Sequence, residues 1–168
     1  FFFKSAAQDI IRDYKFIGIQ ERFDESLVVL KYLIGVPLGD MLYVPSKING
    51  SHDEQCNYIQ PSVLTQKMQD YLNGTAWERR SWWDRALYDA ANQSLDLTID
   101  SIGREKVQST LEKFRTAQEI VKKRCTPLAK PPCATDKHHR EPEETNCLFL
   151  DSGCAFECLD EVSKELGI

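Results

Sequence analysis

The sequence has little glycine and proline, no long hydrophobic run and no excess of positive charge. Its 168 residues include 8 glycines and 7 prolines, too few for a collagenous or low-complexity chain. No stretch approaches the roughly 20 apolar residues that a membrane-spanning helix needs, so we expect no transmembrane segment in this chain. The 26 Asp and Glu outnumber the 21 Lys and Arg, which argues against a nucleic-acid-binding protein.

Recognisable catalytic and metal-binding motifs are also missing. None of the scattered glycines forms GxxxxGK or GxGxxG, the loops whose backbone N–H groups hold phosphates. The histidines His52, His138 and His139 lie in polar segments and form no recognisable Ser-His-Asp set. The shortest cysteine spacing, from Cys154 to Cys158, is not that of paired zinc ligands, so we expect no metal site.

Cysteines and N-glycosylation sequons are well represented. Asn-x-Ser/Thr occurs at Asn49, Asn73 and Asn92, and each is a candidate glycosylation site, with Asn49 the best and Asn92 the weakest. Together with an even number of cysteines, these sequons indicate a lumenal or secreted protein, in which disulfides are favoured over metal. Their pairing cannot be read from the sequence, but we expect at least four to be bonded, mainly within 125–158. The six candidates are Cys56, Cys125, Cys133, Cys147, Cys154 and Cys158.

The first third of the chain has the pattern of an α/β unit. Residues 16–19 form a short apolar run typical of a strand that is buried on both faces. A helix then begins at Asp24 or Ser26, either of which can cap it, and ends at Gly35. Residues 41–44 read as a second short strand. We therefore expect a helix-rich α/β fold whose two strands are completed by an N-terminal half or by a partner chain.

Helical periodicity dominates the middle of the chain. We expect a helix over 62–72, and then a long helix that starts with the capping-box spacing of Thr75 and Glu78. Gly103 interrupts this run before a second long helix reaches residue 123. The apolar face of this second helix consists of Val107, Leu111, Phe114, Ala117 and Val121. Its mixed-charge opposite face is most simply a solvated surface.

The tryptophans allow two interpretations. The three tryptophans could line a sugar site, because aromatic faces stack on carbohydrate rings. The helical spacing of Trp82 and Trp83 with Leu87 favours a role in the core or in helix packing instead.

The last quarter of the chain is predicted to be a disulfide-pinned tail. Residues 126–145 hold four of the seven prolines and show no periodicity. A short helix around residues 156–166 ends before Gly167. We therefore divide the chain into residues 1–125, the α/β part, and residues 126–168, the cysteine-rich tail.

The carboxylates Glu21, Asp24 and Glu25 are weak catalytic candidates. They lie at a predicted strand-to-helix junction, where open α/β sheets place ligands, and one of them could act as a general base. The alternative is that they stabilise the start of the helix by capping it and by complementing its dipole. We favour this alternative.

The residues around this junction resemble a known family. Residues 17–30, IGIQERFDESLVVL, followed by Asp40-Met-Leu-Tyr43, resemble the E-x-F-D-E-S-L-V-L-L … D-x-x-Y segment of the galactose-3-O-sulfotransferases, the galactosylceramide sulfotransferase group. Residues 87–95, 103–125 and 147–158 are similar, in order, to later helices and to the cysteine-rich end of that family. The similarity runs from about residue 14 to 160.

The resemblance implies a Golgi-lumenal, type II membrane glycoprotein with a P-loop-like α/β fold, of which this chain is the C-terminal half. Such enzymes transfer a sulfuryl group from 3′-phosphoadenosine 5′-phosphosulfate (PAPS) to a terminal galactose on a glycan or glycolipid. The family's donor-binding loops and catalytic base precede the FDESL segment. The resemblance therefore implies that this chain alone, which starts at Phe1, binds no cofactor and is inactive. Glu21, Phe23, Asp24, Glu25 and Ser26 carry over as motif members without a catalytic role.

Two other functions stay open at this point. One is a secreted, non-enzymatic structural or binding protein that reuses the sulfotransferase scaffold. The other, outside the family, is a small disulfide-rich extracellular recognition domain.

Overall fold

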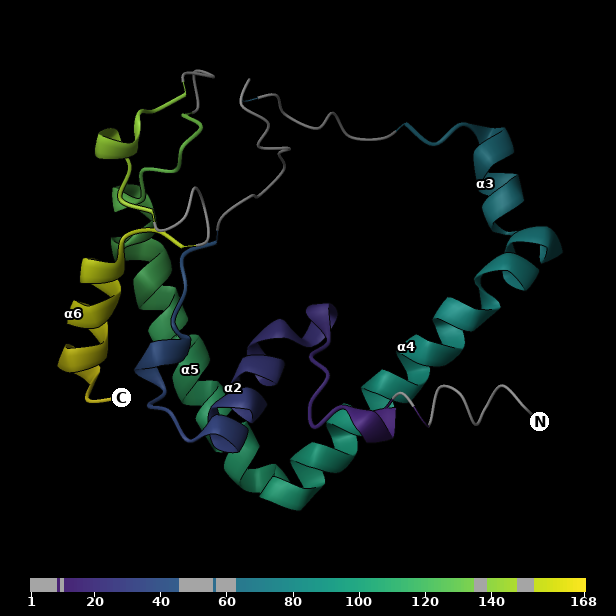
Figure 1. Ribbon diagram of the computed structural model, residues 1–168, viewed down its shortest axis with the longest axis horizontal. Helices are drawn as coiled ribbons and strands as arrows, with labels where there is room; N and C mark the ends of the chain where they lie inside the picture. The colour runs from purple at the N-terminus through teal and green to yellow at the C-terminus, as the bar shows by residue number, and fades with distance from the viewer. Residues whose placement is uncertain (1–8, 10, 46–55, 57–62, 135–138, 148–152) are drawn as a thin grey trace. The chain divides into compact units, whose positions relative to one another are not determined.

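The computed structural model describes residues 9, 11–45, 56, 63–134, 139–147 and 153–168, and regular structure there is helical (Figure 1). No β-strand occurs within these ranges, only isolated bridges between Cys133 and His139 and between Cys147 and Cys154. In chain order the elements are η1 (Gln20–Arg22), α2 (Phe23–Ile34), η2 (Gly39–Met41), α3 (Gln66–Leu72), α4 (Thr75–Ile102), α5 (Arg104–Arg124), η3 (Thr126–Leu128), η4 (Pro142–Glu144) and α6 (Phe156–Leu166). The expectation of a helix-rich chain is confirmed.

The chain folds into two compact units. The first contains Phe1–Leu30 and Ser62–Gln108, and the second contains Lys31–Pro61 and Ser109–Ile168. The boundary between the units falls inside α2 and inside α5, so each of these helices contributes to both.

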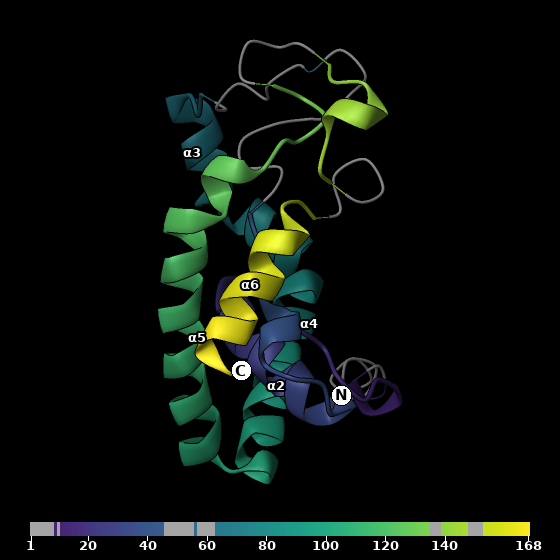
Figure 2. The ribbon, with the colours of Figure 1, turned by 90° about the vertical axis from the view of Figure 1, so that its left-hand side faces the viewer.

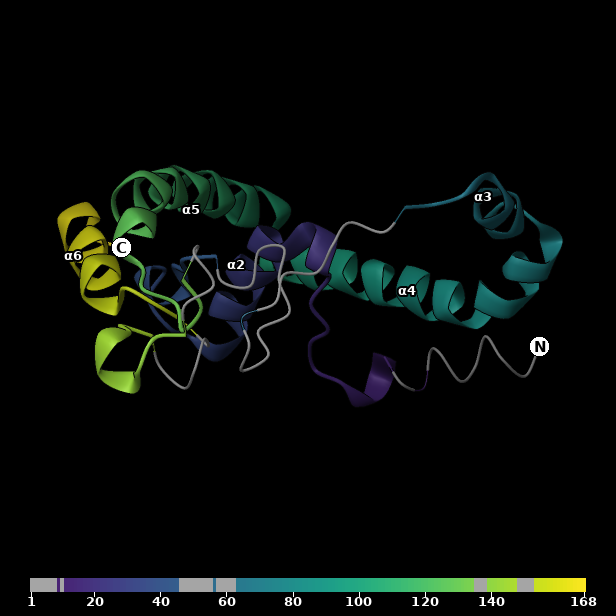
Figure 3. The same cartoon turned by 90° about the horizontal axis from the view of Figure 1, so that it is seen from above.

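The first unit is built on the C-terminal half of α4. Its buried apolar side chains are Ile19, Val28, Val29, Ala91, Leu95, Ile99 and Val107. At the other end of α4, the short helix α3 adjoins its N-terminus (Figures 1 and 3). The rings of Tyr71 and Trp77 lie 6.0 Å apart at this junction.

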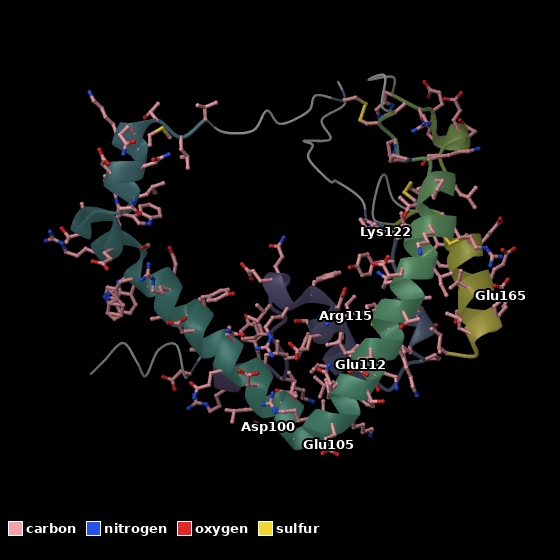
Figure 4. The ribbon with its side chains drawn as sticks, turned by 180° about the vertical axis from the view of Figure 1, so that it is seen from behind. Asp100, Glu105, Glu112, Arg115, Lys122 and Glu165 are labelled. Atoms are coloured by element: carbon pink, nitrogen blue, oxygen red, sulfur yellow. A yellow bond between two sulfur atoms is a disulfide. The ribbon has the colours of Figure 1, made fainter. Side chains whose placement is uncertain are left out.

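The second unit packs α6 alongside the C-terminal part of α5 (Figure 2). Its buried core includes Leu38, Leu42, Val44, Leu111, Phe114, Ala117, Val121, Leu159 and Val162. Arg124 of α5 donates to Glu165 of α6 over 2.6 Å and to Glu161 over 3.2 Å, and Glu165 is labelled in Figure 4. The hydrogen bond from Arg124 lowers the pKa of Glu165.

All six cysteines are disulfide-bonded, which confirms the prediction that at least four would be. Cys56 pairs with Cys133, Cys125 with Cys158, and Cys147 with Cys154. The Cys125–Cys158 bond joins the end of α5 to the first turns of α6. The tail is therefore attached covalently to the long helix before it.

The periodicity predicted for the second long helix is confirmed. All five apolar positions on its predicted face are at most 3% exposed in α5. Charged residues that include Glu105, Glu112, Arg115 and Lys122 lie exposed along the rest of the helix (Figure 4). The predicted helix ends at Gly35 and Gly167 are also confirmed, because both glycines have positive φ, 75° and 64°.

The prediction of a strand over residues 16–19 is wrong, because this segment is irregular. Ile19 is buried as expected, but no strand among the described residues satisfies its peptide groups. Its N–H donates to Ser26 Oγ over 2.9 Å, and the same hydroxyl donates to its carbonyl oxygen over 3.2 Å. One serine of α2 therefore satisfies the backbone that a sheet neighbour was expected to satisfy.

The strand predicted over 41–44 is also wrong, for a similar reason. Met41 belongs to η2, Leu42 after it is extended, and residues 42–45 form no strand in the described part of the chain. The side-chain amide of Gln118 on α5 accepts from the Tyr43 N–H over 3.4 Å and donates to the Tyr43 carbonyl over 3.3 Å. A carboxamide has one donor group and one acceptor group, as a peptide unit does. The Gln118 side chain therefore makes the two hydrogen bonds that a neighbouring strand would make.

The N-termini of α3 and α4 differ from the prediction. Residues 63–65 precede α3 rather than belonging to it, and Thr65 caps the helix by accepting from the Met68 N–H over 3.4 Å. Thr75 forms no capping box, because it already lies within α4 and Gly74 occupies the N-cap.

Of the two packing roles predicted for the tryptophans, burial in the core is wrong. Trp82 and Trp83 are each 42% exposed and Leu87 is 39% exposed. Helical spacing places residues on a common face but does not establish that another element covers that face.

Candidate functional site

The three candidate carboxylates lie together at the start of α2. Glu21 is exposed in η1, whereas Asp24 and Glu25 are half-buried in the first turn of α2. The structure therefore brings the predicted residues together, on consecutive helical turns rather than at the end of a strand.

Arg22 connects this junction to α4. Its Nε donates to Glu25 Oε2 over 2.5 Å, its Nη1 to Asn92 Oδ1 over 2.7 Å, and its Nη2 to Asp96 Oδ1 over 2.9 Å. The hydrogen bond to Glu25, together with the hydrogen bond to Asp96, raises the pKa of Arg22. Burial of the guanidinium lowers this pKa, but by less. We name Arg22, Glu25, Asn92 and Asp96 the Arg22 network. The planar guanidinium of Arg22 fixes the start of α2 against the C-terminal half of α4.

A second contact uses Glu21. The Tyr88 hydroxyl on α4 donates to Glu21 Oε2 over 3.2 Å. Desolvation, and then this hydrogen bond, raise the pKa of Tyr88, so the phenol keeps its proton at neutral pH. Tyr88 is therefore a hydrogen-bond donor to Glu21.

These contacts support the structural interpretation of the carboxylates. Glu25 is paired with a guanidinium and Glu21 accepts from a phenol, while acidic side chains in the first turn of α2 complement the helix dipole. In the part of the chain that the structure describes, no group of three or more His, Cys, Asp or Glu is placed to hold a metal ion. His139 is exposed, and His52 and His138 lie outside the described residues.

Sequence reasoning missed the partners of these carboxylates. Asn92 and Asp96 lie 70 and 74 residues from Arg22, and Tyr88 lies 67 residues from Glu21. No local pattern connects residues so far apart in sequence.

Replacing Arg22 tests whether this network is structural. Arg22→Met keeps most of the side-chain volume and removes three hydrogen bonds, so we expect a loss of about 1 kcal/mol in the free energy of unfolding. Urea denaturation measures this loss. The matched control, Arg12→Met, removes an arginine that is 71% exposed and pairs with Asp9 and Asp13, and should change stability by only a few tenths of a kcal/mol. Equal effects of the two variants would contradict a structural role for the network.

The sequons occupy different environments. Asn73 is exposed at the C-cap of α3, whereas Asn92 is half-buried within α4 and accepts from Arg22. Asn49 lies outside the described residues. A glycosyltransferase needs an accessible, extended acceptor segment, which the middle of a packed helix does not offer.

We therefore predict glycan on Asn73 or Asn49 and none on Asn92. Enzymatic deglycosylation in heavy-oxygen water converts each occupied Asn to a mass-labelled Asp, which peptide mass spectrometry locates. A label at Asn92, or no label at any of the three positions, would contradict this prediction.

Comparison with known proteins settles the family. The family model described as galactose-3-O-sulfotransferase matches residues 2–138 of the chain. The chain belongs to the galactose-3-O-sulfotransferase family. This confirms the resemblance that the FDESL segment carries.

The individual relatives are distant and longer. The galactosylceramide sulfotransferase of Homo sapiens is 30% identical over 117 residues, which cover 70% of this chain and 25% of that protein. The Mus musculus protein of the same name is 29% identical over the same shares. Galactose-3-O-sulfotransferase 4 of Homo sapiens is 27% identical over 131 residues, 76% of this chain and 26% of that protein. The chain thus aligns with about a quarter of the length of these relatives.

No solved structure matches the chain significantly. None of the helices in the described ranges is long and apolar enough to cross a membrane.

Proposed function

We propose that this chain is the C-terminal part of a galactose-3-O-sulfotransferase-like glycoprotein, and that it is not catalytic by itself. The observation that carries this proposal is the coverage: the family model spans most of the chain, while the chain spans about a quarter of its relatives. In the complete protein, these helices belong to a P-loop-like α/β fold.

The chemistry of sulfuryl transfer supports a protein in which a different segment binds the donor and supplies the base. The sulfuryl group leaves the phosphosulfate of PAPS for the 3-hydroxyl oxygen of a terminal galactose, and a base takes the hydroxyl proton. Such a transfer needs donors around the phosphates and a positioned base. This sequence contains no glycine-rich phosphate loop. An N-terminal half or a second chain therefore supplies the PAPS site and the base, and the acceptor is a galactose-terminated glycan or glycolipid.

The contacts of the FDESL segment favour a supporting role for this chain. Glu25 holds Arg22, and the Ser26 hydroxyl satisfies both peptide groups of Ile19. These motif residues fix the backbone and the start of a helix. The segment positions neighbouring parts of the protein and does not itself react.

A secretory location fits the same account. Three disulfides need an oxidising compartment. We place the protein in the Golgi lumen or in the secreted fraction, as a glycoprotein.

Analysis of the native protein tests the proposal. Intact mass, N-terminal sequencing and an assay for sulfate transfer from PAPS to a galactoside should find this sequence joined to, or co-purifying with, a segment that binds the donor, and activity should require both. A lone mature chain without activity would overturn the proposal. It would favour the alternative, a secreted non-enzymatic binding or structural protein derived from the same scaffold.

A further inference from the structure

The N-terminal half of α4 exposes large apolar side chains. The buried residues of α4 all lie in its C-terminal half, from Ala91 onward. Before Ala91, five large apolar or aromatic side chains are each 38–42% exposed. They are Trp77, Trp82, Trp83, Leu87 and Tyr88. Contiguous apolar surface of this kind is typical of sites at which proteins interact, so we searched this half of α4 for the chemistry of a partner.

One face of this half has the spacing of a helix that pairs with another helix. Intervals of four and three residues place six positions in line along it, as in helices that pack side by side. These six residues, which we name the α4 seam, are Thr75, Arg79, Trp82, Ala86, Asp89 and Gln93. Ala86 is half-buried and the others are exposed. A surface hollow of about 430 Å³ lies on the same face, with Trp82 and Ala86 in its lining.

The α4 seam is complementary to itself when two copies lie antiparallel. A two-fold axis midway between Trp82 and Ala86 sets each of these residues opposite the other in the second copy, because a contact made once across such an axis is made twice. The large indole of each copy then enters the hollow beside the small Ala86 of the other. At the next seam position on either side, the same axis sets Arg79 opposite Asp89, so the interface gains two pairs of opposite charges.

Other arrangements of two α4 helices lack this match. Parallel packing in register would set Arg79 opposite Arg79 and Asp89 opposite Asp89. An antiparallel shift that stacks Trp82 on Trp82 would set Arg79 opposite Arg85. Like charges across an interface repel, so the charges of the seam select the register in which Trp82 meets Ala86.

We propose that the N-terminal half of α4 is an interface with a second copy of this chain, packed antiparallel with Trp82 on Ala86 and with Arg79 paired to Asp89. Two helices that meet over this length form a small interface, below roughly 1,200 Å² in total, so the dimer is weak, with a Kd on the order of 10 µM. The proposal depends on the α4 seam alone. It does not require that the chain be part of a sulfotransferase.

Exchange of the two seam charges tests both the interface and its register. Sedimentation velocity of the full chain, from about 1 to about 200 µM, measures the Kd of the dimer. Arg79→Glu makes both charged contacts of the dimer repulsive, and Asp89→Lys does the same with the opposite sign. Each variant alone should dimerise at least about tenfold more weakly than the unchanged chain. An equimolar mixture of the two regains opposite charges at both contacts, so it should form a heterodimer with a Kd within about threefold of the original.

Arg80→Glu is the matched control. It makes the same change of charge on the opposite side of the helix from the seam and should leave the Kd unchanged. A chain that stays monomeric at about 200 µM would overturn the proposal. So would single variants that dimerise as well as Arg80→Glu, or a mixture that fails to associate while both variants keep their helical circular dichroism. Sedimentation uses neither PAPS nor an acceptor, so none of these results counts against the proposed function.

Discussion

Removing the disulfide between Cys125 and Cys158 is expected to lower the free energy of unfolding by about 3–4 kcal/mol. The bond closes a segment with a sequence separation of 33 residues, and loop-closure entropy of that length accounts for this magnitude. Both sulfurs are buried, with Cys125 at 0% and Cys158 at 7% exposure, so the variant is best made as Cys125→Ala with Cys158→Ala. Urea unfolding of the double variant measures the loss, and α6 should lose its protection from hydrogen exchange.

The Cys147–Cys154 bond provides the matched control. Its sequence separation is only 7, so the double alanine variant should lose about 2 kcal/mol by the same argument. If the two double variants lost equal stability, the attachment of α6 to α5 would not depend on the longer-range bond.

Replacing Gly39 by alanine is expected to cost about 2–3 kcal/mol. Gly39 begins η2, which packs against α6, and a Cβ there would overlap Ser163 Oγ and come within 2.8 Å of the Ile168 carbonyl oxygen. The Ser163 hydroxyl is itself bonded to that carbonyl over 2.9 Å, so it cannot move without breaking the bond. Overpacking at such a close approach typically costs roughly 1–3 kcal/mol, and here part of the obstacle is backbone.

Gly18→Ala is the control for this prediction. A Cβ at Gly18 would meet Phe16 and Ser26 at an ordinary 3.5 Å, so we expect a change within about 1 kcal/mol. Thermal unfolding of both variants compares them. A Gly39→Ala protein as stable as Gly18→Ala would show that η2 and α6 do not pack as closely as described.

The sequence predicted helices well wherever their apolar positions repeat. The apolar face of α5 and the glycine ends of α2 and α6 depend on local spacing and on the left-handed conformation of Gly35 and Gly167. Both signals are contained within one helix. Neither signal depends on which element packs against the helix.

The failures share a different cause, which is contact between residues distant in sequence. Apolar runs such as 16–19 predict burial correctly at Ile19, but whether the backbone pairs with a strand or with Ser26 is not encoded locally. Tyr43 finds its partner, Gln118, 75 residues away. The exposure of Trp82 likewise depends on which elements cover α4.

The candidate site was predicted only in part. The sequence located the carboxylates at the start of α2, and the structural alternative for them was the favoured one. It could not identify Arg22 as their organising partner, because that role depends on two acceptors on α4. The cysteine pairing was open for the same reason, since an even count predicts bonds but not partners.

Binding of the donor's product nucleotide tests the central claim most directly. Calorimetry of the folded 168-residue chain with adenosine 3′,5′-bisphosphate should detect no binding, because this sequence contains no glycine-rich phosphate loop. On the proposed function, a longer form of the protein that includes the proposed donor-binding segment should bind the same nucleotide with a micromolar Kd. Micromolar binding by the 168-residue chain alone would contradict the account and would place a nucleotide site among the residues described here.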